Sequence, residues 1–168
     1  MKKKILSILV IVAGHTCFSQ PYVSLATSLT ATAGTVADKS NIALEVGQQW
    51  DVFSLGVDFG KTTLSPVGKR DTSLYMELRP NLNVFQQGKF TNTFTPGIGY
   101  IFNAKENLLI EFTTGIEYSY SARFHINVFF GQYFYSGLTS ASNVNFFGLS
   151  GAWYFGPSHT GSLVKINK

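Results

Sequence analysis

The feature that most constrains this chain is a regular alternation of apolar and polar residues, clearest over residues 74–84. One set of alternate positions holds Leu74, Met76, Leu78, Pro80, Leu82 and Val84, and the other holds Tyr75, Glu77, Arg79, Asn81 and Asn83. Successive side chains of a β-strand point to opposite faces, so the pattern predicts a strand with one apolar and one polar face. Its length matches a tilted strand that crosses a bilayer, which takes about 9–11 residues.

Seven further segments alternate in the same way, and no helical segment separates them. They cover residues 23–33, 41–46, 53–60, 94–102, 110–120, 125–130 and 147–155, with the pattern blurred at Phe129 and Phe146. Eight strands suit an antiparallel up-and-down sheet that closes into a small barrel. The predicted links at 34–40, 61–71, 103–107 and 136–143 are long, and those at 48–50, 86–89 and 121–123 are short. Alternating link lengths are typical of membrane barrels, whose short turns face the periplasm.

Two prolines fall inside predicted strands. Pro80 and Pro96 each lack the N–H group that a ladder needs, and a closed barrel has no free edge where this loss is harmless. We therefore expect either a bulge at these positions or strands that are shorter than the alternation suggests.

The polar face distinguishes a membrane barrel from a soluble one. Its ionisable members are Glu45, Asp58, Glu77, Arg79, Glu111, Glu117 and His125. They are mixed with many Gly, Ser and Thr residues, which suits a narrow, filled interior. The alternating runs contain no lysine, whereas the links contain Lys39, Lys61, Lys69, Lys89 and Lys105. The sequence therefore predicts an all-β transmembrane barrel with its polar face inside and its apolar face toward lipid.

Aromatic residues support this orientation, because they make up 15% of the chain and gather near the ends of the predicted strands. Such girdles mark the two membrane interfaces of outer-membrane barrels. The predicted girdle residues are Tyr22, Phe59, Phe85, Phe90, Tyr100, Phe102, Tyr118, Tyr120, Phe134, Tyr135, Trp153, Tyr154 and Phe155. The alternative is a soluble periplasmic or secreted lipocalin-like barrel, with the apolar face inside around an apolar ligand.

The N-terminus has the layout of a secretory signal peptide. Lys2, Lys3 and Lys4 precede the apolar stretch 5–13, and small residues stand before Gln20. We predict a cleaved signal at 1–19, a barrel domain at 20–156 and a polar, irregular C-terminal tail at 157–168. Cleavage would remove three of the four net positive charges, so no basic patch for nucleic acid is expected. The rest of the chain has no apolar run long enough for a membrane-spanning helix.

With these features in place, the chain resembles the small outer-membrane β-barrels, such as the membrane domain of OmpA and the related OmpX. The resemblance covers residues 20–156 and rests on the signal peptide, the eight alternating runs and the ending Trp153-Tyr154-Phe155. It implies an outer-membrane location and a final strand that the barrel-assembly machinery recognises during insertion. In that family the aromatic residue usually ends the chain, whereas here further residues follow Phe155. The resemblance implies no catalytic residue.

The ionisable residues of the polar face permit two interpretations. Glu77 and Arg79 share one strand face, Gly97 and Gly99 leave space on the next strand, and Glu45 is expected at a similar height. An ion gate is one interpretation. We favour a buried charged network that plugs the barrel, because eight strands enclose a lumen just wide enough for side chains to fill and buried charges must be paired.

His125 with Glu117 raises the alternative of an outer-membrane lipid hydrolase. The lipid A deacylases, barrel enzymes of similar size, carry a Ser two residues after their His, and this chain has Asn127 there. His125 also follows a short link, which places it at the periplasmic end. We therefore predict a non-enzymatic protein, with no metal site and no cofactor.

The predicted function is a structural or surface-interaction role in the outer membrane. The longest predicted link, 61–71, contains Lys61, Lys69 and Arg70. Its charge predicts contact with lipopolysaccharide or another acidic surface, in addition to the membrane lipid around the barrel.

Overall fold

The computed structural model describes residues 19–32, 35–63, 72–102, 108–135, 144–156 and 161–166. Nearly all of the predicted signal peptide lies outside these residues, as do Lys69 and Arg70 of the candidate contact link.

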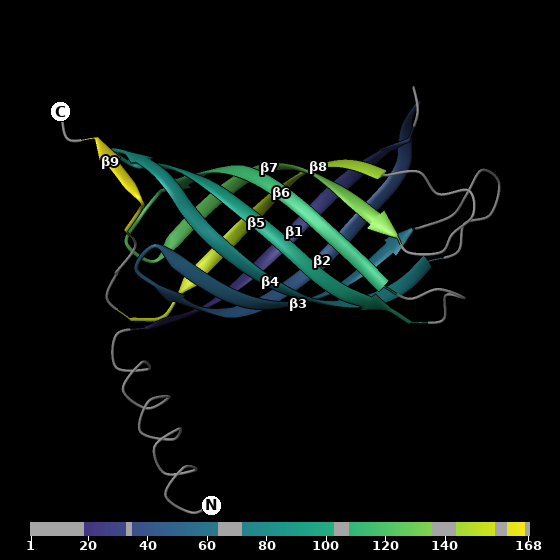
Figure 1. Ribbon diagram of the computed structural model, residues 1–168, viewed down its shortest axis with the longest axis horizontal. Helices are drawn as coiled ribbons and strands as arrows, with labels where there is room; N and C mark the ends of the chain where they lie inside the picture. Colours follow the sequence, from purple (N-terminus) through teal and green to yellow (C-terminus); the bar gives the residue numbers. More distant parts are fainter. Residues whose placement is uncertain are drawn as a thin grey trace, which may run out of the picture.

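Eight long strands form the molecule, and a ninth, short strand follows near the C-terminus (Figure 1). Their bounds are β1 Gln20–Thr32, β2 Thr35–Trp50, β3 Phe53–Thr63, β4 Thr72–Gln87, β5 Phe90–Ile101, β6 Leu108–Ser119, β7 Phe124–Tyr135, β8 Val144–Tyr154 and β9 Val164–Ile166. Consecutive strands from β1 to β8 pair antiparallel, and the β1–β8 pair closes the ring. The predicted eight-stranded up-and-down barrel is confirmed. No helix long and apolar enough to cross a membrane occurs in the described part of the chain.

The short links lie together at one end of the barrel, on the left in Figure 1. They turn at Asp51, at Gly88 and over residues 120–123; Gly88 has a φ of 60° and Asp51 one of 45°. The prediction of a long first link at 34–40 is wrong, because residues 35–40 continue β2 and Thr32 pairs with Thr35. This β1–β2 hairpin extends beyond the last residues that alternate between apolar and polar. The alternation therefore did not predict that residues 35–40 belong to a strand.

The two prolines meet at one rung of the β4–β5 ladder. Leu78 pairs with Ile98 and Leu82 pairs with Phe94, so the continuous register puts Pro80 opposite Pro96. Both missing N–H groups therefore fall at the same place, so a single interruption of the ladder accommodates both prolines. Neither expected solution applies at these positions, since both strands run on without a bulge; the register shift of this pair lies further along, between Asn83 and Phe85.

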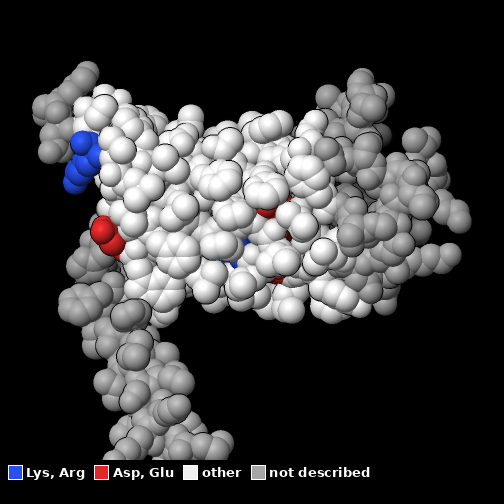
Figure 2. Space-filling model, in the orientation of Figure 1, with Lys and Arg blue, Asp and Glu red and all other residues white. Residues whose placement is uncertain are grey.

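Apolar side chains cover the outside of the barrel. Leu25 is 61% exposed and Leu78 is 43% exposed, whereas its neighbour Glu77 is 1% exposed. Uncharged residues make up nearly all of the described face in Figure 2. The orientation predicted from the sequence is confirmed, and it is the reverse of the one that a lipocalin-like ligand carrier requires.

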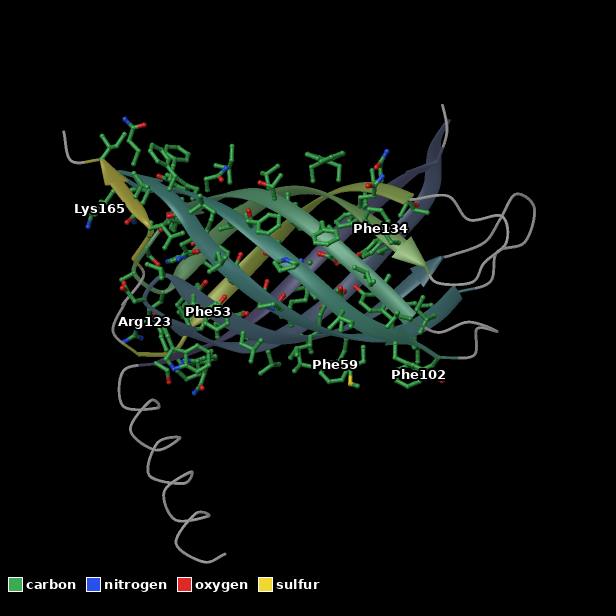
Figure 3. All side chains as sticks on the ribbon, viewed as in Figure 1. Phe53, Phe59, Phe102, Arg123, Phe134 and Lys165 are labelled. Carbon is green, nitrogen blue, oxygen red and sulfur yellow. The ribbon has the colours of Figure 1, made fainter. Side chains whose placement is uncertain are left out.

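Several predicted girdle aromatics do lie on the outer surface, among them Phe59, Phe90 and Phe102, and Figure 3 shows Phe59 and Phe102 on the outside of the barrel. The assignment is wrong for Tyr22 and Tyr154, which are buried in the lumen with their ring centroids 5.3 Å apart.

Part of the predicted irregular tail is ordered. β9 lies parallel to the last residues of β4, with Val164 paired to Phe85 and Ile166 paired to Gln87. This pairing contradicts the expectation of an irregular segment.

Candidate functional site

Five of the seven ionisable residues of the polar face meet near the middle of the lumen. Direct cross-strand pairing aligns Glu45 of β2 with Asp58 of β3, and Asp58 with Glu77 of β4. Arg79 follows on β4, and Glu111 of β6 pairs with Gly97 of β5. β5 thus contributes glycine between two strands that carry long acidic side chains, so it leaves the space that they occupy.

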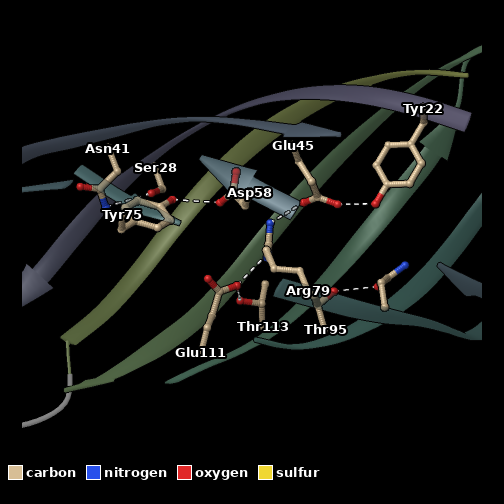
Figure 4. A network of polar contacts seen from close by, with 11 residues as sticks. Tyr22, Ser28, Asn41, Glu45, Asp58, Tyr75, Arg79, Thr95, Glu111 and Thr113 are labelled. Carbon is tan, nitrogen blue, oxygen red and sulfur yellow. Dashed lines mark hydrogen bonds and ion pairs between the residues drawn. The ribbon is translucent and has the colours of Figure 1, made fainter. Parts of the chain in front are cut away.

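Arg79 joins opposite sides of this cluster (Figure 4). Its Nη1 donates to Glu45 Oε2 at 2.8 Å, and its Nη2 donates to Glu111 Oε1 at 2.7 Å. The Arg79 and Glu45 side chains are 13% and 14% exposed, and that of Glu111 is 2% exposed. Charge-assisted hydrogen bonds of this length are strong in a largely dehydrated interior. The guanidinium therefore links β4 to β2 and β6 across the lumen.

Hydroxyl and amide groups extend the network to further strands. Tyr22 donates to Glu45 and Thr113 donates to Glu111, so each carboxylate partner of Arg79 has a second donor. Tyr75 donates to Asp58 Oδ2 at 3.0 Å, and Thr95 donates to Asn81 at 2.7 Å. These tyrosines and threonines were not predicted as members of the network, although their strand positions place them on the polar face.

Acids outnumber bases in this cluster. Glu45, Asp58, Glu77 and Glu111 surround one guanidinium, and no hydrogen-bond partner within the described residues reaches either carboxyl oxygen of Glu77. Asp58 Oδ1 and Arg79 Nε also lack a hydrogen-bond partner there. The single guanidinium therefore serves four acidic side chains, and it makes direct ion pairs with Glu45 and Glu111.

His125 and Glu117 form a second pair, closer to the short turns. His125 Nδ1 lies 2.8 Å from Glu117 Oε1, and its ring centroid is 4.6 Å from that of Tyr154. The backbone partner of Glu117 is Asn127. The imidazole is 2% exposed and is held between a carboxylate and an aromatic ring. Such a histidine connects β7 to β6 and β8 and needs no reacting partner to account for its burial.

Aromatic rings fill the lumen toward the end with the long links. Tyr133 stacks on Phe146 with ring centroids 4.1 Å apart, and Phe129 lies 6.1 Å from the same ring. Phe129 and Phe146, which blurred the alternation, both point inward. Gly148 pairs with Phe129 and Gly131 pairs with Phe146. Each ring therefore lies over a glycine of the neighbouring strand, where no side chain takes up the space.

Little open space remains in the lumen. Among the described residues, the two cavities around Arg79 have volumes of about 60 and 10 Å³. A cavity needs roughly 10–15 Å³ to hold one water molecule, so these two have room for a few waters at most. No group of three or more His, Cys, Asp or Glu side chains within the described ranges is arranged to hold a metal ion.

A closed ring of eight antiparallel strands, with an apolar exterior and a filled polar lumen, defines the fold class of the small transmembrane β-barrels. A designed transmembrane β-barrel aligns with a TM-score of 0.60 and 11% identity, over 81% of this chain and 95% of that chain. Neisserial surface protein A gives 0.58 and 7%, over 82% and 97%. The N-terminal β-barrel domain of Pseudomonas aeruginosa OprF gives 0.57 and 12%, over 82% and 99%. No protein-family model and no curated protein matches the sequence.

At these identities the likeness concerns the fold. It confirms the predicted similarity to small eight-stranded outer-membrane barrels and leaves the role of the chain to be argued from its own residues.

Proposed function

We propose that the chain is an outer-membrane protein with a structural or surface-interaction role, whose lumen is plugged by the Arg79 network and the Phe129–Tyr133–Phe146 rings. The observation that carries the proposal is the continuous apolar exterior, which includes Leu25, Leu44 and Leu149 at 45–61% exposure. Exposed apolar surface of this extent would make a soluble protein aggregate, whereas lipid covers it at no cost. Outer-membrane location is supported by the barrel fold, since closed barrels span that membrane.

Cell fractionation tests this location. We expect the protein in the outer-membrane fraction, extracted by mild detergent and with a heat-dependent shift in electrophoretic mobility. Recovery in the soluble fraction without detergent would refute the proposal.

The plugged lumen is tested by liposome swelling. Because rings and ion pairs fill the cross-section, proteoliposomes should swell in sugar solutions no faster than protein-free liposomes. Fast sugar entry, or stable single-channel steps in a planar bilayer, would contradict a plug and favour the gate interpretation.

A non-enzymatic role is supported by the environment of His125. Its Nδ1 contacts Glu117, and Asn127 stands where the deacylase pattern has a nucleophile. Replacement of His125 by Ala should leave the lipid A mass profile of the cells unchanged. A profile that depends on His125 would instead support the hydrolase alternative.

The partner that we propose for the surface role is an acidic surface such as lipopolysaccharide. The positive charge of Lys61, Lys69 and Arg70 supports this partner. Lys61 is exposed near the end of β3 away from the short turns, and the other two residues lie outside the described residues. The variant Lys61→Gln/Lys69→Gln/Arg70→Gln should bind immobilised lipopolysaccharide more weakly than the wild type. Lys89→Gln, a charge loss at the opposite end, is the matched control. We also propose that the barrel-assembly machinery inserts this protein into the outer membrane. Depleting cells of that machinery tests this step.

A further inference from the structure

The segment after the last barrel strand is fixed to the short-turn rim by specific contacts. Leu163 N donates to Asn83 O at 2.9 Å, and Gly161 N donates to Asp51 O at 3.1 Å. The side chain of Asn83 adds a hydrogen bond from Nδ2 to Gly161 O at 2.9 Å. A Cβ atom at Gly161 would lie 1.9 Å from Asp51 Oδ1, so a larger residue there would require the Asp51 side chain to move.

β9 occupies an edge that the barrel leaves open. The β3–β4 ladder ends where Phe53 pairs with Leu82, but β4 continues to Gln87. Asn83 N still donates to Val52 O at 2.9 Å. Beyond Asn83 this side of β4 would present unpaired backbone groups without the tail, and β9 pairs with it over residues 85–87. Covering such an edge prevents pairing with other chains. Covering the edge explains the backbone pairing of β9 but does not depend on the side chains of β9.

The register fixes which way those side chains point. Lys165 pairs with Gln86, whose partner across the β4–β5 ladder is Thr91, a lumen-facing residue with 3% exposure. Lys165 therefore lies on the lumen side of the sheet. Val164 and Ile166 lie on the opposite, outer side, because side chains alternate along a strand.

The outer side at this level belongs to the lipid-facing surface. Ile166 pairs with Gln87, which in turn pairs with Phe90, and Phe90 is 55% exposed on the outside of the barrel. Val164 and Ile166 are 53% and 44% exposed. These two side chains therefore continue the apolar exterior beyond the end of β3 rather than facing the aqueous mouth. Figure 3 shows β9 and Lys165 at the short-turn end of the barrel.

We infer that β9 is a membrane-interface anchor: Val164 and Ile166 insert into phospholipid at the boundary between headgroups and acyl chains, and Lys165 faces water at the barrel mouth. This inference rests on the proposed outer-membrane function, which puts the short-turn end in the periplasmic leaflet. Alternation of two apolar residues around a lysine fits an interfacial strand, because the apolar side chains enter lipid while the charge stays hydrated. The tail thus widens the lipid contact of the barrel on the β4 side.

Single-cysteine fluorescence tests the inference. In a Cys17→Ser background the full chain has no cysteine, so Val164→Cys and Lys165→Cys each carry one probe on opposite faces of the same strand. Each variant is labelled with a nitrobenzoxadiazole fluorophore and reconstituted into phosphatidylcholine vesicles. One set of vesicles contains phospholipid with an acyl-chain nitroxide near the headgroup, and a second set receives iodide in the water. Ile166→Cys is an independent probe of the apolar face.

We expect the lipid nitroxide to quench the probes at positions 164 and 166 and iodide to quench the probe at 165. Equal quenching of positions 164 and 165 by either agent would overturn the inference. So would protection of position 164 from both agents, which would indicate a second copy of the chain on that face.

Leu25→Cys separates this failure from failure of the proposed function. Leu25 lies on the outer face within β1, so a membrane-spanning barrel requires its probe to be quenched by a nitroxide placed deeper in the acyl chain. Quenching at 25 without quenching at 164 rejects the anchor alone, and absence of quenching at 25 rejects the membrane barrel itself.

Discussion

Replacement of Arg79 by Met removes the guanidinium from the lumen while keeping a long side chain there. Glu45 and Glu111 then lose the ion pairs of 2.8 and 2.7 Å and keep only their hydroxyl donors, in a space that admits little water. Removing one partner of a buried ion pair costs about 3–5 kcal/mol, because the remaining charge stays buried without compensation. Two carboxylates are affected here, so we expect a loss in the free energy of unfolding at the upper end of that range.

The assay is equilibrium unfolding by guanidinium chloride of barrels folded into detergent micelles, followed by tryptophan fluorescence and by electrophoretic mobility without heating. Arg123→Met, at the exposed turn between β6 and β7, is the matched control and should change stability by less than about 0.5 kcal/mol. The triple variant Arg79→Met/Glu45→Gln/Glu111→Gln should recover part of the loss, since Glu45 and Glu111 then carry no charge, whereas the buried Asp58 and Glu77 still lack the guanidinium. A loss below about 1 kcal/mol for Arg79→Met would refute the reasoning, because it would mean that water reaches the network freely.

Three further predictions use the same unfolding measurement. Gly97→Ala puts a Cβ atom 2.0 Å from Glu77 Oε1 and should destabilise the barrel by about 1–3 kcal/mol, with Glu77→Ala restoring stability in the double variant. Gly131→Ala puts a Cβ atom 2.4 Å from the Phe146 ring, 2.5 Å from Thr113 Oγ1 and 2.8 Å from Phe112 O, and it should cost a similar amount, part of which Phe146→Leu should relieve. No relief would mean that Thr113 or the Phe112 backbone, and not the ring, is the obstacle. Leu149→Arg, on the outer face, should cost about 2–4 kcal/mol in lipid vesicles if it lies near the bilayer midplane, and Leu149→Met less than about 1.5 kcal/mol. Equal stability of the two Leu149 variants would show that this face meets water.

The strands and their two faces could be predicted from the sequence because both follow from one local pattern. The same alternation also indicated that two of the aromatic residues predicted for the girdle face the lumen. Tyr22 precedes Val23, and Tyr154 stands between Trp153 and Phe155, so strict alternation places both tyrosines on the polar side, where the structure has them. The aromatic type suggested a membrane interface, but position in the alternation decides where a side chain points.

Features that depend on how two strands are paired could not be read from either strand alone. Pro80 and Pro96 each look unfavourable in isolation, and only the register shows that they share one rung. The partners of Arg79 are similar, because Glu45 and Glu111 come from strands that are not its neighbours in sequence and are reached only across a closed lumen. β9 was missed for the same reason, since its strand partner among the described residues is the overhanging end of β4.

The positions of the glycines in the barrel strands indicate that the lumen is packed rather than open. Large inward side chains repeatedly lie over a glycine of an adjacent strand, at a place where a Cβ atom would overlap them. The pairs are Gly56 with Glu45, Gly60 with Tyr75, Gly97 with Glu77, Gly131 with Phe146 and Gly148 with Phe129, with distances of 2.0–2.4 Å from the added Cβ to the side chain. A water-filled channel would place no such demand on neighbouring strands, because its side chains could lean into the solvent. An eight-stranded ring is too narrow for two long side chains at one level, so each bulky residue requires its neighbour to be small. These five glycines therefore lie in strands, where they make room for inward side chains.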